Sequence, residues 1–325
     1  MRCIFIYLMA FAWGAKLLAA DQPADAAMGV YEGFWTTADG KKGRVTAQIR
    51  PIGEKRYDGF VAIYRARALE WALKLAPNAE GSMKFKGSAA KSQDGSLTAS
   101  LNGSCEIADG ALKGSFKGDM GEGTFEAERV HHESPTMGAK SPAMATVLFD
   151  GKPSDQWSDF HWKVTPEGAM VVGGGDIHAA EKYANYNLHL EFRTPLMPTA
   201  QGQARGNSGV YLQDLYEVQV LDSFGLFPLG KDDCGAIYSM KAPEVNACLP
   251  PGEWQTYDIT FVQSNASRNG NPTVTVTLNG VMVIEKFELP QKTPSERGFL
   301  RLQDHGNPVE YRNIWVEPFF AADRK

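Results

Sequence analysis

The sequence has no excess of positive charge and little helical periodicity. The first limits the classes of function that the protein can have, and the second limits its fold class. Lys and Arg together number 33 against 38 Asp and Glu, so the formal net charge is −5. A chain without a basic excess lacks the electrostatic footprint of a nucleic-acid-binding protein, and no nucleic-acid partner is expected. With 43% hydrophobic residues among 325, the composition is that of a folded protein with one large or two modest domains.

Long apolar runs are also scarce, and the first twenty residues hold the one that stands out. There Arg2 precedes an apolar stretch over residues 4–13, and small residues follow at Ala19 and Ala20. This order is typical of a secretory signal peptide. The stretch is short for a spanning helix, which needs about 20 residues. We therefore expect residues 1–20 to be a signal peptide, the protein to be secreted or periplasmic, and no stable membrane span.

Cysteines are few, and one of the four, Cys3, lies in the predicted signal peptide. Among the remaining three, Cys234 and Cys248 are 14 positions apart and could close a loop in an oxidising compartment. The alternative is that Cys105 and both of these are simply buried thiols. No Cys–His spacing typical of a metal site occurs.

Short segments that alternate apolar and polar residues recur through residues 28–130. Asn-Gly and Asp-Gly pairs, such as those at 102–103 and 109–110, separate them. A period of two is typical of half-buried strands, and these pairs favour tight hairpins. We predict a small antiparallel β barrel or sandwich, with one helix candidate from Ala66 to Leu75. No histidine precedes His131, which indicates an accessory domain.

Two prolines, with Gly and Ser, mark residues 131–144 as a linker. Residues 145–318 then form a second β-rich part with many strand candidates. Asn279-Gly280 lies between two alternating runs and predicts a hairpin. So many strands in about 170 residues indicate an all-β, two-sheet jelly roll.

Polar side chains share one face of each of three predicted strands. They are His189, Glu191 and Arg193, then Glu217 and Gln219, then Arg301, Gln303 and His305. Such planar side chains suit sugar hydroxyls, which both donate and accept hydrogen bonds. A solvated sheet face is the alternative.

A second dense segment runs from Arg205 to Leu212. Gly206 and Gly209 permit close approach of the backbone to a ligand. Asn207 and Ser208 either contact that ligand or cap a turn.

Ordered short motifs extend through the second part of the chain. They are LFDGK at 148–152, LHLEFR at 188–193, GNSGVY at 206–211, YEVQVLD at 216–222, CGAIY at 234–238, PGEWQTY at 251–257, LQDHG at 302–306 and YRNI at 311–314. As a set, they resemble the 3-keto-disaccharide hydrolase family, a concanavalin-like jelly-roll domain of exported bacterial proteins. The resemblance implies that fold and an action on sugars oxidised at the third carbon, so a carbohydrate is the expected partner.

A ketone at C3 acidifies the C2 hydrogen, which suggests a route to glycosidic cleavage. A base removes the C2 proton, the enolate expels the C1 substituent, and water then adds. We expect Glu217 or His305 to be the base and Asp222 to act as an acid or to orient His305. Arg193 or Arg205 would polarise the ketone. The residues expected to bind the substrate are Glu191, Asn207, Gln219 and Gln303.

The sequence requires no cofactor, but it allows a bound divalent metal ion that would stabilise the enolate in place of the arginine. Its candidate ligands are Glu191, Asp222, Asp304 and His305. Asp176 with His178 is a weaker candidate.

Two other functions compete with this enzyme. A jelly roll serves non-catalytic, lectin-like carbohydrate binding equally well. A conventional retaining glucanase is disfavoured, because Gln219 stands where such a strand would carry its central acid.

Overall fold

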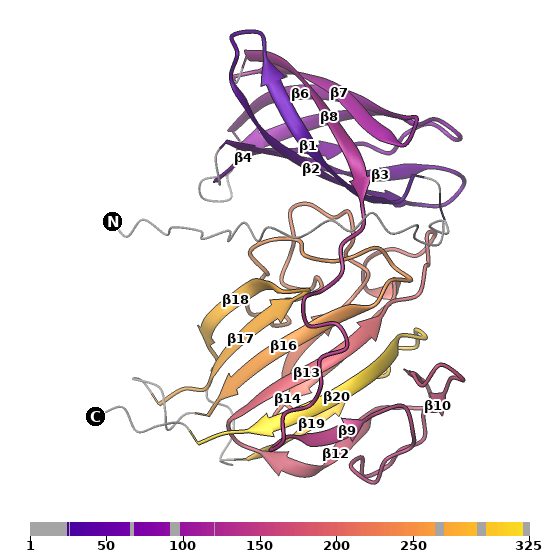
Figure 1. Ribbon diagram of the computed structural model, residues 1–325, viewed down its shortest axis with the longest axis vertical. Coiled ribbons are helices and arrows are strands. Elements are labelled where there is room, and N and C mark those ends of the chain that lie inside the picture. Colours follow the sequence, from indigo (N-terminus) through magenta and orange to yellow (C-terminus); the bar gives the residue numbers. More distant parts are fainter. Residues whose placement is uncertain are drawn as a thin grey trace. The chain divides into compact units, whose positions relative to one another are not determined.

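The structure is a computed structural model that describes residues 25, 27–65, 68–91, 98–119, 121–263, 270–290 and 297–320. The predicted signal peptide, residues 1–20, lies outside these residues. Contacts divide the chain into two units. The first reaches His132 and includes Phe224–Phe227, and the second contains the rest from Glu133 onward. Both units are built from β-strands, which confirms the predicted all-β class (Figure 1).

The first unit is a closed antiparallel barrel of eight strands. Each strand pairs with the next, and β1 pairs with β8 to close the barrel. The strands are β1 (Gly29–Thr37), β2 (Lys42–Pro51), β3 (Tyr57–Arg65), β4 (Ala68–Leu75), β5 (Lys84–Lys91), β6 (Thr98–Ala108), β7 (Ala111–Gly118) and β8 (Gly121–Val130). Of the two predicted architectures, the barrel is therefore confirmed.

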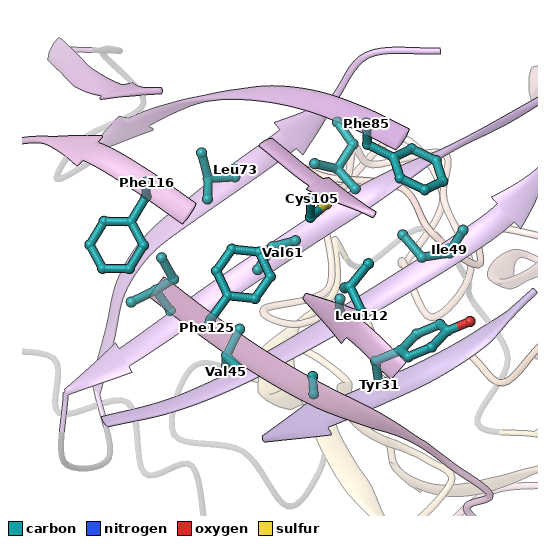
Figure 2. Close-up of a cluster of buried hydrophobic side chains, with 14 of the residues drawn as sticks. Tyr31, Val45, Ile49, Val61, Leu73, Phe85, Cys105, Leu112, Phe116 and Phe125 are labelled. Atoms are coloured by element: carbon teal, nitrogen blue, oxygen red, sulfur yellow. The ribbon is translucent and has the colours of Figure 1, made fainter. Parts of the chain in front are cut away.

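Apolar side chains from alternate strand positions fill the barrel interior (Figure 2). They include Tyr31, Val45, Ile49, Val61, Leu73, Phe85, Cys105, Leu112, Phe116 and Phe125. Burial raises the pKa of the Cys105 thiol to about 12. Cys105 therefore behaves as a small apolar core residue at neutral pH.

The predicted helix from Ala66 to Leu75 is wrong, because the described part of this segment is strand β4. Trp71, Leu73 and Leu75 are all buried, at a period of two. The Ala- and Leu-rich composition favours a helix locally. Pairing with β3 and β5 inside the barrel overrides that preference.

The turn predicted at Asn102-Gly103 is also wrong. Both residues lie inside β6, where Gly103 pairs with Gly87 on one side and with Phe116 on the other. The turn comes later, at Asp109 and Gly110, with φ of 53° and 79°. Of Asn102-Gly103 and Asp109-Gly110, only Asp109-Gly110 therefore forms a hairpin turn.

The second unit contains two antiparallel sheets. The larger has the order β10-β11-β20-β13-β16-β17-β18, with β9 paired to β20, and the smaller has the order β12-β19-β14-β15. The larger sheet comprises β9 (Thr146–Phe149), β10 (Lys163–Val164), β11 (Met170–Val171), β13 (Tyr186–Arg193), β16 (Gln255–Val262), β17 (Thr273–Leu278), β18 (Val281–Glu288) and β20 (Glu310–Pro318). The smaller comprises β12 (Ile177–Tyr183), β14 (Ser208–Leu212), β15 (Tyr216–Val220) and β19 (Gly298–Leu302).

The two sheets bury apolar residues on their facing sides. The buried set includes Leu188, Leu190, Phe192, Val210, Val218, Val220, Ile259, Leu300 and Leu302. Two tyrosines of the larger sheet also reach the smaller one. Tyr257 Oη donates to the Gln219 carbonyl at 2.6 Å, and Tyr311 Oη bonds to Ser208 Oγ at 2.8 Å. These contacts confirm the two-sheet arrangement predicted for this part of the chain.

The hairpin predicted at Asn279-Gly280 is confirmed between β17 and β18. Asn279 and Gly280 both have positive φ, at 52° and 77°. The buried Asn279 side chain also accepts from Thr256 N at 2.9 Å and donates to the Ala247 carbonyl at 2.9 Å. The turn residue therefore fixes a neighbouring loop as well.

The segment predicted as a linker is partly attached to the larger sheet. Ser134 Oγ lies 2.6 Å from Thr256 Oγ1, and Thr136 Oγ1 donates to Asp258 Oδ2 at 2.6 Å. Gly138 N donates to Glu191 Oε1 at 2.7 Å. Residues 134–138 are thus hydrogen-bonded to β13 and β16. We refer to residues 134–139 as the strap.

Candidate active site

The outer face of the smaller sheet carries the densest group of polar side chains that the sequence predicted. Tyr211 pairs across β14 and β15 with Glu217, and across β14 and β19 with Arg301. Their strand neighbours Val210 and Val218 are buried toward the larger sheet. Because successive side chains point to opposite faces, Tyr211, Glu217 and Arg301 form one row on the outer face.

Glu217, on β15, is the carboxylate of this row and is only 8% exposed. Tyr211 Oη donates to Glu217 Oε2 at 2.9 Å. Burial raises the pKa of Glu217, and the Tyr211 hydrogen bond and the positive charge of Arg301 offset part of this rise. A carboxylate whose pKa is raised toward neutrality is a stronger base than an exposed one.

Gly209 provides the space that the Glu217 carboxylate occupies. A Cβ placed on Gly209 would overlap Glu217 Oε1 and crowd the Glu217 Cδ at 2.9 Å. Gly209 pairs with Gln219 on β15, and its carbonyl accepts from Gln303 N at 3.0 Å. A missing side chain on β14 thus lets Glu217 lie between the two glutamines.

Arg301 is held beside Glu217 by two carboxylates and an aromatic ring. Its Nε donates to Asp214 Oδ1 at 2.5 Å, and its Nη1 donates to Asp176 Oδ2. The guanidinium carbon lies 3.6 Å from the centre of the Tyr211 ring. These three contacts fix the cation while leaving other N–H donors of the guanidinium group for a ligand.

Two buried amides beside this row share one partner, Gln203, on the 3-10 turn Gly202–Ala204. The Gln203 Oε1 accepts from Asn207 Nδ2 and from Gln219 Nε2, both at 3.0 Å. Because Gln203 Oε1 can only accept, both amide groups must direct their nitrogens toward it. Their oxygens, Asn207 Oδ1 and Gln219 Oε1, are buried and find no hydrogen-bond donor within the described residues.

Gln303 presents a third unpaired amide oxygen. Its Nε2 donates to Tyr211 Oη at 3.3 Å, and its Oε1 is buried without a donor among the residues that the structure describes. A buried, unpaired carbonyl oxygen costs about 1–3 kcal/mol. Three such acceptors on one sheet face favour a ligand rich in hydroxyl donors.

His305 and Asp304 lie in the turn that follows β19. His305 is exposed, and its positive charge also lowers the pKa of Glu217. The Asp304 carboxylate accepts from Gly175 N at 2.9 Å and from Gly306 N at 2.8 Å. Asp304 therefore organises the turn that carries His305.

The structure places Asp222 and Arg205 away from the roles expected of them. Arg205 Nε donates to Asp222 Oδ2 at 2.7 Å, and both side chains are almost fully buried. The Asp222 carboxylate is thus bound to Arg205 where the sequence suggested an acid or a partner for His305. The Arg205 guanidinium also donates to the Pro198 carbonyl at 3.2 Å. The pair stabilises the loop before β14.

Glu191 and Arg193 lie on the larger sheet, on the side opposite its apolar core. The Glu191 carboxylate accepts from Arg312 Nε at 2.6 Å and from the strap at Gly138 N. Arg193 Nε donates to Glu310 Oε2 at 2.7 Å. The two sheets share the core between them, so the structure does not bring this pair together with Glu217.

Glu191 belongs to a buried acid–base cluster beneath the strap. His189 Nδ1 lies 2.7 Å from Asp258 Oδ1, and its Nε2 lies 3.8 Å from Glu191 Oε1. Burial opposes ionisation of Glu191, but its hydrogen-bond partners outweigh burial and lower its pKa to about 2. Burial likewise lowers the pKa of His189, yet Asp258 and Glu191 raise it overall.

The candidate metal ligands do not converge. Glu191 is on the larger sheet, Asp222 is bound to Arg205, and Asp304 binds backbone amides. Among the described residues, no group of three or more His, Cys, Asp or Glu side chains is arranged to hold a metal ion. Within the same residues, no helix is long and apolar enough to cross a membrane.

Sequence reasoning singled out none of four residues of this site as catalytic or substrate-binding. They are Gln203, Tyr211, Asp214 and Arg301, and the alternation of residues 208–212 and 300–305 does place Tyr211 and Arg301 on polar faces. Asp176 appeared only as a weak metal ligand. Strand pairing is the signal that could have identified them, because it brings together residues about 90 positions apart, such as Tyr211 and Arg301.

Comparison with known proteins places the second unit in a family. The profile of the 3-keto-alpha-glucoside-1,2-lyase-like domain matches residues 144–317. A solved structure of a candidate glycosyl hydrolase from Parabacteroides distasonis ATCC 8503 is 35% identical, with a TM-score of 0.50. The alignment covers 55% of this chain and 85% of that chain. No curated protein matches the chain.

Two further candidate glycosyl hydrolases of the same organism are similar at lower identity. One is 23% identical with a TM-score of 0.42, covering 54% of this chain and 94% of that chain. The other is 22% identical with a TM-score of 0.41, covering 54% and 99%. The profile match and the 35% identical relative together show that this chain belongs to the 3-keto-alpha-glucoside-1,2-lyase-like family of carbohydrate-active hydrolases and lyases.

Proposed function

We propose that the chain is an exported enzyme that cleaves 3-keto-glycosides by elimination followed by hydration. The observation that carries this proposal is the buried Glu217 carboxylate beside the Arg301 cation, on the face that also holds the unpaired amide oxygens. A base next to a cation suits the removal of a proton from a carbon adjacent to a ketone. It does not require the carboxylate pair of an ordinary glycosidase.

Glu217 takes the proton from C2 of the 3-keto sugar, and the electron pair of that C–H bond delocalises onto the C3 oxygen. Arg301 stabilises the resulting enolate through its remaining N–H donors. This role replaces the one that the sequence assigned to Arg193 or Arg205, because both of those are engaged elsewhere. Tyr211 holds the Glu217 carboxylate in position.

The enolate then re-forms the C3 ketone as a C1–C2 double bond forms and the C1–O bond breaks. His305 gives a proton to the departing oxygen. Water adds its hydroxyl to C1, and C2 regains a proton. The sum is hydrolysis of the glycosidic bond, with a 1,2-unsaturated keto sugar as the intermediate.

Sugar recognition falls to Asn207, Gln219 and Gln303. Each amide nitrogen is already bonded within the protein, so each oxygen can accept a sugar hydroxyl. Three oriented acceptors fix the ring relative to Glu217, which shortens the approach of C2 to the base.

The first experiment compares a 3-keto-glucoside with the matching unoxidised glucoside and follows release of the aglycone. The proposal expects release from the keto sugar alone, and exchange of the C2 hydrogen with deuterium in heavy water. A parallel assay with a chelator decides whether a divalent ion takes part. Release from the unoxidised glucoside would instead support a conventional glycosidase.

Variants assign the chemistry to residues. Glu217→Gln and His305→Ala should each lower the rate at least about 100-fold, the usual contribution of a positioned acid or base. Unchanged rates in both would contradict the assignment. Sugar binding without turnover in the unaltered protein would make this face the recognition surface of a lectin-like protein.

A further inference from the structure

Two buried cysteines of the second unit contact each other. Cys234 is 1% exposed and Cys248 is 2% exposed. Their side chains are hydrogen-bonded to each other, and both are free thiols in this structure. The proposed catalytic steps use neither of them.

Ser223 holds the two cysteines in this position. Cys234 N donates to Ser223 Oγ at 3.0 Å. Asn246 Nδ2 donates to the Ser223 carbonyl at 2.8 Å, and Asn246 Oδ1 accepts from Cys248 N at 3.1 Å. The backbone of each cysteine is therefore fixed to the same serine, one directly and the other through Asn246. The thiol contact follows from this hydrogen-bonded framework.

The loop that carries Cys234 is joined to β15, the strand of Glu217 and Gln219. Gln219 N donates to the Ala236 carbonyl at 3.0 Å, and Tyr238 N donates to the Glu217 carbonyl at 3.0 Å. Tyr257 Oη also lies 3.2 Å from Cys234 Sγ while donating to the Gln219 carbonyl. The thiol pair thus lies directly behind the polar face.

We propose that Cys234 and Cys248 are a disulfide-forming pair that closes this loop against β15. Each thiol loses a proton and the pair loses two electrons, which reduce an oxidised protein disulfide of the thiol-oxidase class. One S–S bond forms in this chain while one is broken in the oxidant. The reaction occurs as the chain folds, before burial of the two sulfurs blocks access. Cys105 stays a thiol because it lies inside the barrel.

The pairing has a structural consequence that is independent of the proposed catalytic activity. The bond closes a loop whose ends are 14 positions apart and removes freedom from the unfolded chain. It restrains the segment that hydrogen-bonds to the backbone of Glu217 and Gln219. An exported protein would meet the oxidising conditions that preserve such a bond.

Peptide mapping tests the pair directly on the full chain. The protein is unfolded and refolded with oxidised and reduced glutathione, its free thiols are blocked, and it is digested with trypsin without reductant. Cleavage at Lys231, Lys241 and Arg268 leaves the two cysteines on separate peptides. We expect these peptides to be recovered as one linked species that separates on reduction. Recovery of both peptides as blocked thiols, or linkage of either to Cys105, would overturn the proposal.

A stability measurement supplies a second readout. In the oxidised protein, the thermal transition of the second unit should lie roughly 6–12 °C above that of the reduced protein. Cys248→Ser should abolish this difference, whereas Cys105→Ser should preserve it. If peptide mapping shows the bond in the oxidised protein, equal transitions in the oxidised and the reduced protein would contradict the stabilising role.

Discussion

Tyr211 donates its phenolic proton to Glu217 across the β14–β15 pair, over 2.9 Å. Burial and then the charge of Glu217 raise the pKa of Tyr211 to about 12. Tyr211 therefore keeps its proton at neutral pH and remains a donor to the carboxylate. A neutral donor stabilises the ionised form of Glu217 and so sets the pH at which that group can act as a base.

Removing this donor should move the pH profile of the proposed activity. The hydrogen bond lowers the pKa of Glu217, so Tyr211→Phe should raise that pKa further. Since a base must be ionised, the acidic limb of kcat/KM should shift to higher pH. Steady-state rates across pH check this, with Tyr238→Phe as the matched control at an exposed position. An unshifted limb would mean that Tyr211 does not tune the base.

The space above Gly209 offers a test of geometry that leaves every charge in place. Gly209→Ala would push the Glu217 carboxylate from its position, and we expect at least a 10-fold loss in kcat, because small displacements of a base are costly. Gly173→Ala is the control, since a Cβ at Gly173 meets open space. Equal activity of both variants would show that catalysis does not depend on the position of the Glu217 carboxylate above Gly209.

Arg301 can be tested by changing its shape but not its charge. Arg301→Lys keeps a cation but loses the planar fork that bonds Asp176 and Asp214. We expect kcat to fall at least 10-fold while thermal stability changes little. Arg297→Lys, at an exposed site just before β19, is the control. If Arg301→Lys retained full activity, a simple positive charge would suffice for the enolate.

The cluster beneath the strap should affect stability rather than catalysis. Glu191→Gln removes one partner of a buried ion pair and should cost about 3 kcal/mol of unfolding free energy. Its effect on kcat should be small, because Glu191 is on the larger sheet. Denaturant unfolding checks the first expectation, with Glu128→Gln on the exposed face of β8 as control. A large loss of kcat without a loss of stability would return Glu191 to the active site.

The same cluster predicts a pH window for stability. The pKa of Glu191 is about 2, below its ordinary value of 4.5, so its contribution is lost as pH falls below about 4.5. The pKa of His189 is raised above 6.5, so its contribution is complete below 6.5 and is lost as pH rises through the folded-state value. Both contributions to stability are therefore fully present between about pH 4.5 and pH 6.5. In Glu191→Gln, unfolding free energies across pH should lose the acidic limb, because the group that titrates there is gone. The alkaline limb should weaken, because Glu191 no longer helps to raise the pKa of His189.

Alternation along strands was enough to predict much of the polar face. Glu217 and Gln219 were assigned to one side of their strand, and Gln303 and His305 to one side of theirs. The same pattern in residues 188–193 gave the right faces but the wrong neighbours. Periodicity says which residues share a side of a strand and nothing about the sheet to which that strand belongs.

Long-range pairing limits what the sequence alone can predict. Tyr211 and Arg301 are adjacent only because β14 pairs with β19. The segment Ala68–Leu75 has helix-favouring residues, and only the closed barrel makes it a strand. Both cases depend on contacts between distant residues, which local propensity does not contain.

The strap also bears on where the second unit begins as an independently folding body. The family profile starts at residue 144, but Ser134, Thr136 and Gly138 supply hydrogen bonds to the larger sheet. A polypeptide shortened to residue 144 would expose the His189 and Glu191 cluster to water. The smallest fragment that keeps this cluster enclosed therefore begins about ten residues before the start of sequence similarity to the family.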